Sequence, residues 1–147
     1  MPQKKPAQPD RDCERCPRLR AFLLDNREKY PDWHNAPVDS FGDLNGEILI
    51  AGLAPGLKGA NRTGRPFTGD YAGDLLYDTL LKYGLADGAY KADPEDGLTL
   101  KNCRIANVVR CLPPENKPIG SEVKNCAPFL ISEIETMPNL KIVLALG

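Results

Sequence analysis

The residues best suited to chemistry in this chain of 147 residues lie between positions 52 and 70. This segment reads GLAPGLKGANRTGRPFTGD, and Asp70 is its one carboxylate. Its glycines allow sharp turns and a close approach of the backbone to a ligand. Phe67 lies among turn-forming residues, an unusual place for a ring that only fills a core. The combination predicts a mildly basic loop that binds a ligand.

The cysteines provide a second chemical signal. Cys13 and Cys16 form a C-x-x-C pair, which is typical of a metal or cluster site, and Cys111 and Cys126 form a natural second pair. The fifth cysteine, Cys103, precedes an apolar run and is expected to be a buried small hydrophobe. An odd number of cysteines argues against a disulfide framework. Four thiolates suit zinc and a [4Fe-4S] cluster about equally, and the uneven spacing slightly favours the cluster.

Hydrophobic patterns predict the elements that position these residues. Strands are expected at residues 47–51, 104–109 and 141–147, and helices at 13–29, 70–83 and 121–137. This alternation predicts an α/β fold, a three-layer α/β/α sandwich with a central parallel sheet. The glycine-rich segment then lies at the carboxyl edge of the sheet, where open α/β sheets bind ligands. Asn107 ends the second strand at the same edge, and Ser121 is expected to cap the last helix.

Composition excludes several classes of protein. The net charge of −1 excludes a globally basic nucleic-acid binder, so any anion site must be local. No apolar stretch is long enough to cross a membrane and the first residues lack a signal-peptide core, so a cytoplasmic location is expected. Residues 1–10 are rich in Pro, Gln and Lys, which predicts a disordered tail before one domain at 11–147.

The segment 52–70 resembles the first motif of the iron–sulfur uracil-DNA glycosylases, and is closest to the family 5, or B-type, enzymes. The resemblance covers residues 13–147 and includes 33–37, 41–43 and 107–111. It implies the uracil-DNA glycosylase sandwich, and a monomer in full-length form. It also implies DNA containing uracil or other deaminated bases as substrate, with base flipping and hydrolysis of the N-glycosidic bond. The implied cofactor is a [4Fe-4S] cluster held by Cys13, Cys16, Cys111 and Cys126.

The resemblance assigns roles at the base-binding site. Phe67 is the expected platform for the base, although it suits a hydrophobic plug as well. Asn107 offers the donor and acceptor that uracil needs, unless local backbone groups satisfy its amide. Gly52 and Ala54 belong to the turn that lines the uracil site. Since Ala54 cannot activate water, Asp70 takes that part, although it also suits a simple helix N-cap.

Several basic and aromatic residues have weaker assignments. Arg62 and Arg65 are expected to bind DNA, and Arg110 is a third candidate for phosphate contacts. A solvated surface position is the alternative for each of them. Trp33 and His34 either line the pocket or only pack.

The chain departs from the family pattern near its end. The family's second motif begins His-Pro-Ser, which is absent here, and the one histidine is far upstream. We therefore expect the C-terminal part of the fold to be missing, an open sheet edge at the last strand, and excision near background. The alternative function is a non-catalytic iron–sulfur DNA-binding fragment. A nucleotide-binding enzyme is a weaker third reading, because the loop lacks the Gly-Lys-Ser/Thr ending of a P-loop.

Overall fold

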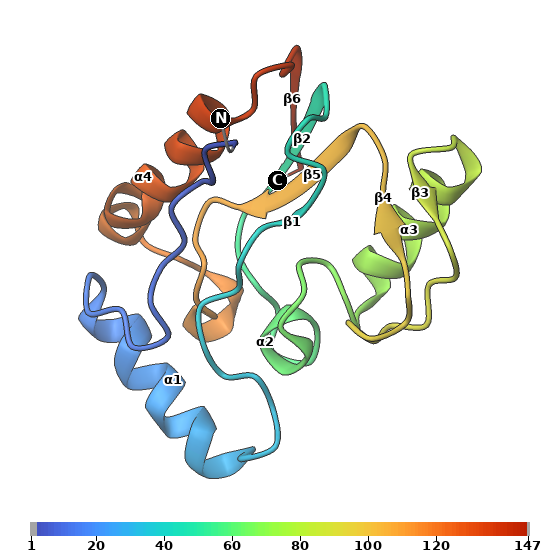
Figure 1. The fold of residues 1–147 in the computed structure, drawn as a ribbon. Coiled ribbons are helices and arrows are strands. Elements are labelled where there is room, and N and C mark those ends of the chain that lie inside the picture. The colour runs from blue at the N-terminus through green and yellow to red at the C-terminus, as the bar shows by residue number, and fades with distance from the viewer. Residues whose placement is uncertain (1–2, 147) are drawn as a thin grey trace.

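The structure is a computed structural model that describes residues 3–146, and its central feature is a sheet with helices on both sides (Figure 1). The elements in chain order are α1 (Pro17–Lys29), β1 (Phe41–Gly42), β2 (Ile48–Gly52), α2 (Ala60–Thr63), α3 (Tyr71–Lys82), β3 (Ala86–Asp87), β4 (Thr99–Leu100), β5 (Cys103–Asn107), the 3-10 turn η1 (Pro114–Asn116), α4 (Gly120–Thr136) and β6 (Ile142–Ala145). None of the described helices is long and apolar enough to cross a membrane.

The main sheet has four strands in the order β1-β5-β2-β6. Strands β5, β2 and β6 are parallel, as predicted, with Ile50 of β2 opposite Ile105 on one side and Leu144 on the other. Strand β1 pairs antiparallel with β5, and the connection after α3 contains the small antiparallel pair β3–β4; the hydrophobic patterns predicted none of these short strands.

Alternation along the strands assigns the helices to opposite faces of the sheet. Ile50 and Ile105 belong to a buried cluster with Tyr77 of α3. Leu49 belongs to a second cluster with Met137, which directly follows α4. In Figure 1, α4 and α3 accordingly lie on opposite sides of the sheet. The predicted three-layer α/β/α arrangement is confirmed.

Strand β6 lies at an edge of the sheet. An apolar strand of this kind was expected to be buried between neighbours. Within the described residues β6 pairs with β2 alone, and Ile142, Val143 and Leu144 are 55%, 48% and 47% exposed. The expected open edge is therefore present.

The ends of the helices confirm the predicted cap at Asp70 and correct the predicted cap at Ser121. Asp70 caps α3 by accepting the N–H of Gly73 at 3.0 Å, and Gly84 follows α3 with a positive φ of 74°. The prediction that Ser121 caps α4 is wrong. The cap position is Ile119, whose N–H donates to the Glu122 carboxylate at 2.9 Å, so the helix begins earlier than expected.

The N-terminal segment differs from the expected disordered tail. Residues 3–10 have no helix or strand, but the side chain of Gln8 is held on the domain. Its Nε2 donates to Ser40 Oγ at 2.8 Å and to Glu133 Oε1 at 2.9 Å, and its oxygen accepts from Arg110 at 2.6 Å. The polar composition that predicted disorder serves here to satisfy buried charges.

Candidate functional site

A cleft of about 990 Å³ opens at the carboxyl ends of β2, β5 and β6. Of the residues expected to bind or act on the base, Ala54, Phe67, Asp70 and Asn107 line it. They come from the loop after β2, the loop before α3, the cap of α3 and the end of β5. The cleft therefore forms where the topology of an open α/β sheet places ligands.

Gly52 lies at the back of this group, where it separates Asn107 from Phe67. A Cβ added to Gly52 would overlap Asn107 Oδ1 and would lie 2.6 Å from Cε2 of the Phe67 ring. The absence of a side chain at this position lets the amide and the ring approach the same strand end. Sequence reasoning placed all three residues in one site, and the structure brings them together.

The amide of Asn107 has an unused acceptor. Asn107 is 2% exposed, and its Oδ1 has no hydrogen-bond partner among the described residues. Its backbone carbonyl is held by Nε of Arg110, which donates at 2.8 Å. An unsatisfied buried polar group costs about 1–3 kcal/mol, which a ligand N–H can offset. Since Asn107 lines the cleft, its Oδ1 is a buried acceptor that a ligand in the cleft can satisfy.

Phe67 has an unusual backbone conformation. Its φ is 55°, in the left-handed region, which costs a residue other than glycine roughly 1–2 kcal/mol. Gly73 of α3 accommodates this geometry, because a Cβ there would collide with the carbonyl of Phe67. The ring is partly buried and lines the cleft. The ring thus packs against the buried cluster around Tyr77 and also lines the cleft.

The carboxylate of Asp70 directs its two oxygens differently. Oδ1 accepts the N–H of Gly73. Oδ2 lies against Gly56 and Gly59; a Cβ on Gly56 would be 3.1 Å from it, and one on Gly59 would overlap it. The glycines of this loop thus admit a carboxylate to the cleft. The helix cap and a chemical role at Asp70 are compatible.

Two of the arginines expected at DNA are buried, so that expectation is wrong for both. Arg65 is 4% exposed and forms two hydrogen bonds of 2.9 Å to Asp96, which hold the pKa of that carboxyl well below its usual range. Arg110 is fully buried, and burial lowers its pKa. Arg62 of α2 is exposed, as a phosphate contact requires.

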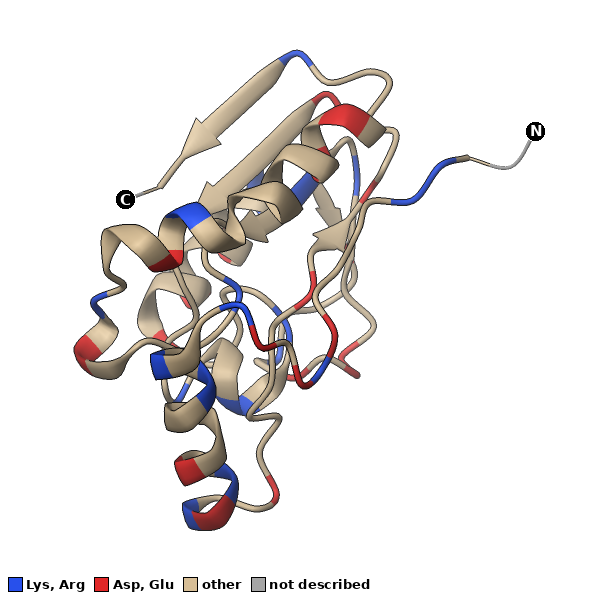
Figure 2. Ribbon diagram, turned by 90° about the vertical axis from the view of Figure 1, so that its left-hand side faces the viewer, with Lys and Arg blue, Asp and Glu red and all other residues tan. Residues whose placement is uncertain are grey.

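The charges of the whole molecule are mixed. Lys and Arg alternate with Asp and Glu along α1 in Figure 2, and the net charge is −1. Any attraction for an anionic polymer is therefore local, for example at exposed Lys58, which lines the cleft, and at exposed Arg62 of α2.

Trp33 and His34 belong to a neighbouring loop and are not among the residues that line the cleft. The Trp33 ring stacks on Tyr30 with centroids 3.9 Å apart. The His34 Nε2 lies 2.9 Å from the carbonyl of Pro37. The packing role is the one these contacts support.

Sequence reasoning missed part of the cleft wall. Leu75, Leu76 and Thr79 of α3 line it, together with Leu144 of β6. The spacing of the α3 residues, one turn apart after the cap at Asp70, was a usable signal for that wall. The contribution of β6 follows only from the strand order.

Four cysteines lie close enough for the charge on one sulfur to affect the pKa of another: Cys13, Cys16, Cys111 and Cys126. Burial, together with a smaller effect of negative charge on the other three sulfurs, raises the pKa of the Cys111 thiol to about 12. These residues come from the segment before α1, the loop after β5 and α4, so the fold gathers them from distant parts of the sequence.

Among the described residues, no three His, Cys, Asp or Glu side chains close around a single metal ion. Cys103 lies apart from the other cysteines. It is fully buried in β5, its Sγ lies 3.4 Å from the carbonyl of Leu85, and burial raises its pKa to about 11. It is the buried small hydrophobe that was expected.

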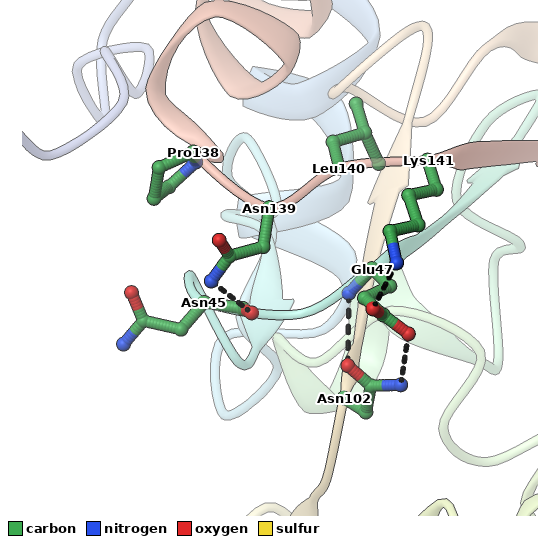
Figure 3. A pocket seen from close by; sticks show the side chains of 7 residues that line it. All are labelled: Asn45, Glu47, Asn102, Pro138, Asn139, Leu140 and Lys141. Carbon is green, nitrogen blue, oxygen red and sulfur yellow. Dashed lines mark hydrogen bonds and ion pairs between the residues drawn. The ribbon is translucent and has the colours of Figure 1, made fainter.

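A smaller hollow of about 430 Å³ lies at the opposite, amino ends of the parallel strands (Figure 3). Its charged groups satisfy one another. The Glu47 carboxylate pairs with Nζ of Lys141 at 2.8 Å and accepts from Nδ2 of Asn102 at 3.2 Å. None of the described residues that line this hollow has a buried, unpaired polar atom like the Asn107 oxygen.

Comparison with known proteins agrees with this geometry. The family model described as "Uracil DNA glycosylase superfamily" matches residues 40–147. The chain is 38% identical over 140 residues to a "Type-5 uracil-DNA glycosylase" of Pyrobaculum aerophilum, with 92% of this chain and 62% of the relative covered. It is 40% identical over 141 residues to one of Thermus thermophilus, with 92% and 64% covered. A "Type-4 uracil-DNA glycosylase" of Pyrobaculum aerophilum is 34% identical over 128 residues, with 85% and 57% covered. The chain thus spans less than two thirds of the length of these relatives.

Proposed function

Because this chain belongs to the uracil-DNA glycosylase superfamily, we propose that its cleft binds uracil flipped out of DNA and cleaves the N-glycosidic bond. The observation that carries this proposal is the meeting of Phe67, Asn107 and Asp70 at one strand edge. DNA with uracil, and with other deaminated bases more broadly, is the proposed substrate. Extrusion of the base costs a few kcal/mol, which contacts inside the pocket must offset.

The base contacts follow from the side chains. The Phe67 ring provides a face on which a pyrimidine stacks, a contact worth about 1–3 kcal/mol per base. The unpaired Oδ1 of Asn107 accepts the N3–H of uracil, and its Nδ2 donates to a neighbouring carbonyl oxygen of the base. Cytosine has no N–H at N3, so this acceptor favours uracil over the normal base.

The reaction separates charge in a defined direction. The electron pair of the C1′–N1 bond leaves with the base as a uracil anion, and the sugar becomes an oxocarbenium-like cation. Asp70, held by its cap contact with Gly73, presents a fixed carboxylate that stabilises this cation. It also orients the water that attacks C1′, and the proton of that water leaves for the carboxylate or solvent. Ala54, which lines the cleft, has no group that could do this.

The four mutually interacting cysteines are proposed to hold a [4Fe-4S] cluster. The donor set fits, since four thiolates are the usual ligands of such a cluster. The cluster would supply a covalent tie between the segment before α1, the loop after β5 and α4. Zinc is the alternative metal, and measuring the iron and zinc content of the purified protein distinguishes the two.

A strand-scission assay tests the proposed function. The chain is incubated with an oligonucleotide that carries one uracil and then with alkali, which breaks the strand at an abasic site. Scission at the uracil and not in a thymine control is the result that the proposed function requires, at a rate near background if the absent His-Pro-Ser motif is needed for turnover. Binding to the uracil duplex without scission would favour the non-catalytic iron–sulfur DNA-binding alternative. Absence of both would refute the proposal.

A further inference from the structure

The loop that carries Phe67 and Asp70 is braced from its outer side by α3 and by the segment 90–98. Arg65 is the first member of this brace. Its Nη1 and Nη2 each donate to Asp96 at 2.9 Å, and its Nε donates to Thr68 Oγ1 at 2.8 Å. Arg65, two residues before Phe67, is thus joined to Thr68, one residue after it. Asp96 holds Arg65 from outside the loop.

Asp96 is itself fixed. Its carboxylate accepts the backbone N–H of Lys91 at 3.0 Å and of Leu98 at 2.9 Å, and its side chain is fully buried. A carboxylate that accepts four hydrogen bonds, two of them from one bidentate arginine, has one orientation. The segment 91–98 therefore presents a rigid anchor to Arg65.

Two tyrosine hydroxyls complete the brace. Tyr77 of α3 donates to the carbonyl of Pro66 at 2.5 Å, and Tyr90 accepts the N–H of Gly69 at 3.2 Å. The two rings stack with centroids 4.7 Å apart, and the Arg65 guanidinium lies 5.2 Å from the Tyr77 centroid and 5.8 Å from the Tyr90 centroid. The brace is a single packed unit and not a set of separate contacts.

The brace holds the residues on both sides of Phe67 and stops just short of Asp70. Phe67 itself keeps a left-handed backbone, which persists only where the surroundings impose it. We propose that Arg65, Asp96 and Tyr90 are positioning residues that hold Phe67 and Asp70 in the conformation that accepts uracil. This inference rests on the proposed function and assigns that function's specificity to a buried arginine and a segment outside the cleft.

The test measures preference for uracil and not activity. The probe is a duplex with one 2′-fluoro-2′-deoxyuridine, whose fluorine disfavours the oxocarbenium-like transition state, and the reference is the same duplex with thymidine. Tyr90→Phe removes only the hydroxyl that holds Gly69, and Asp96→Asn removes the charge that holds Arg65. We expect the ratio of the two affinities to fall about threefold or more for Tyr90→Phe and about tenfold or more for Asp96→Asn. Affinity for the thymidine duplex should stay unchanged, because phosphates dominate it.

Two controls separate positioning from general stability. Tyr83→Phe removes a hydroxyl from a tyrosine that is 70% exposed just after α3, and Leu100→Ala destabilises the core cluster that contains Tyr77 while keeping every hydrogen bond of the brace. Concentrations are corrected for the folded fraction from urea titration, so a structural role alone leaves the ratio unchanged in all four variants. Wild-type protein that prefers uracil, beside Tyr90→Phe and Asp96→Asn with the same preference, would overturn this inference alone. Wild-type protein with no preference would overturn the proposed function and the inference with it.

Discussion

At the scale of single residues, Asp70 combines a structural and a chemical position. One oxygen closes the first turn of α3, and the other lies against two glycines at the cleft. At the opposite wall, Gly52 has no side chain, and this leaves room for the amide of Asn107. These pairs allow tests that change one atom or one methyl group.

Asp70→Asn keeps the shape of the side chain and an oxygen for the cap, but removes the negative charge. In a form extended to the length of its relatives, we expect this substitution to lower single-turnover excision at least about a hundredfold, on the order of 3 kcal/mol of lost electrostatic stabilisation. Affinity for DNA should change little. Equal rates for the variant and the parent would leave Asp70 as a helix cap alone.

Gly52→Ala places a methyl group against the Asn107 oxygen and the Phe67 ring. We expect preference for uracil over cytosine duplexes to fall at least about tenfold, the effect of roughly one lost ligand hydrogen bond, because cytosine lacks the N3–H that Asn107 accepts. Gly120→Ala is the matched control, because a Cβ there meets nothing within 4 Å. An unchanged preference in Gly52→Ala would show that the two side chains do not need this spacing.

At the scale of elements, the site depends on ties between segments that are far apart in the sequence. The cysteines join the start of α1, the loop after β5 and α4, while the Arg65–Asp96 pair joins the Phe67 loop to the segment before β4. Each tie predicts a measurable response when its chemistry is changed.

Protein purified without oxygen should contain about four irons per chain, since a four-thiolate cubane requires that number. Metal analysis and visible absorption measure this directly. Cys103→Ser should leave iron content and colour unchanged, because Cys103 is buried apart from the other four thiols. Stoichiometric zinc without iron would refute the cluster.

The Arg65–Asp96 pair also predicts the acid sensitivity of the fold. Hydrogen bonds from Arg65 lower the pKa of Asp96 below its ordinary 3.8 in the folded state. The pair therefore stabilises the fold fully above that ordinary value and loses this contribution as pH falls below it. Urea titrations at pH 6 and at pH 3 should show a larger loss of stability in wild-type protein than in Asp96→Asn. Equal losses in both would mean that the pair is not a source of acid sensitivity.

At the scale of the molecule, the two edges of the sheet differ within the described residues. The two-residue strand β1 forms the edge beside β5, whereas β6 forms the other edge and exposes Ile142, Val143 and Leu144. An apolar strand with an unpaired edge is a template for pairing with another chain. The cleft lies beside this strand, so the state of the edge bears on the site.

We expect the chain to self-associate as concentration rises, and Val143→Lys to reduce this association, because an edge charge opposes strand pairing. Sedimentation velocity over a concentration series measures the effect. Ile131→Lys, at a residue of α4 that is 51% exposed, is the control for a general gain of solubility. Equal effects of the two substitutions would show that β6 is not the contact.

The sequence by itself determined the local features of this protein. The strand before Gly52 and the cap at Asp70 rest on short-range rules of hydrophobic pattern and capping chemistry. The grouping of Phe67, Asn107 and Asp70 followed from one further rule, that parallel strands end at a common edge.

Only the tertiary structure decided which polar residues are buried. Arg65 and Arg110 were expected at a surface, but each meets a carboxylate from a distant segment. Gln8 was expected in a disordered tail and instead completes the Arg110–Glu133 network. Burial of a charge depends on whether a partner arrives from elsewhere in the chain, and no local pattern carries that information.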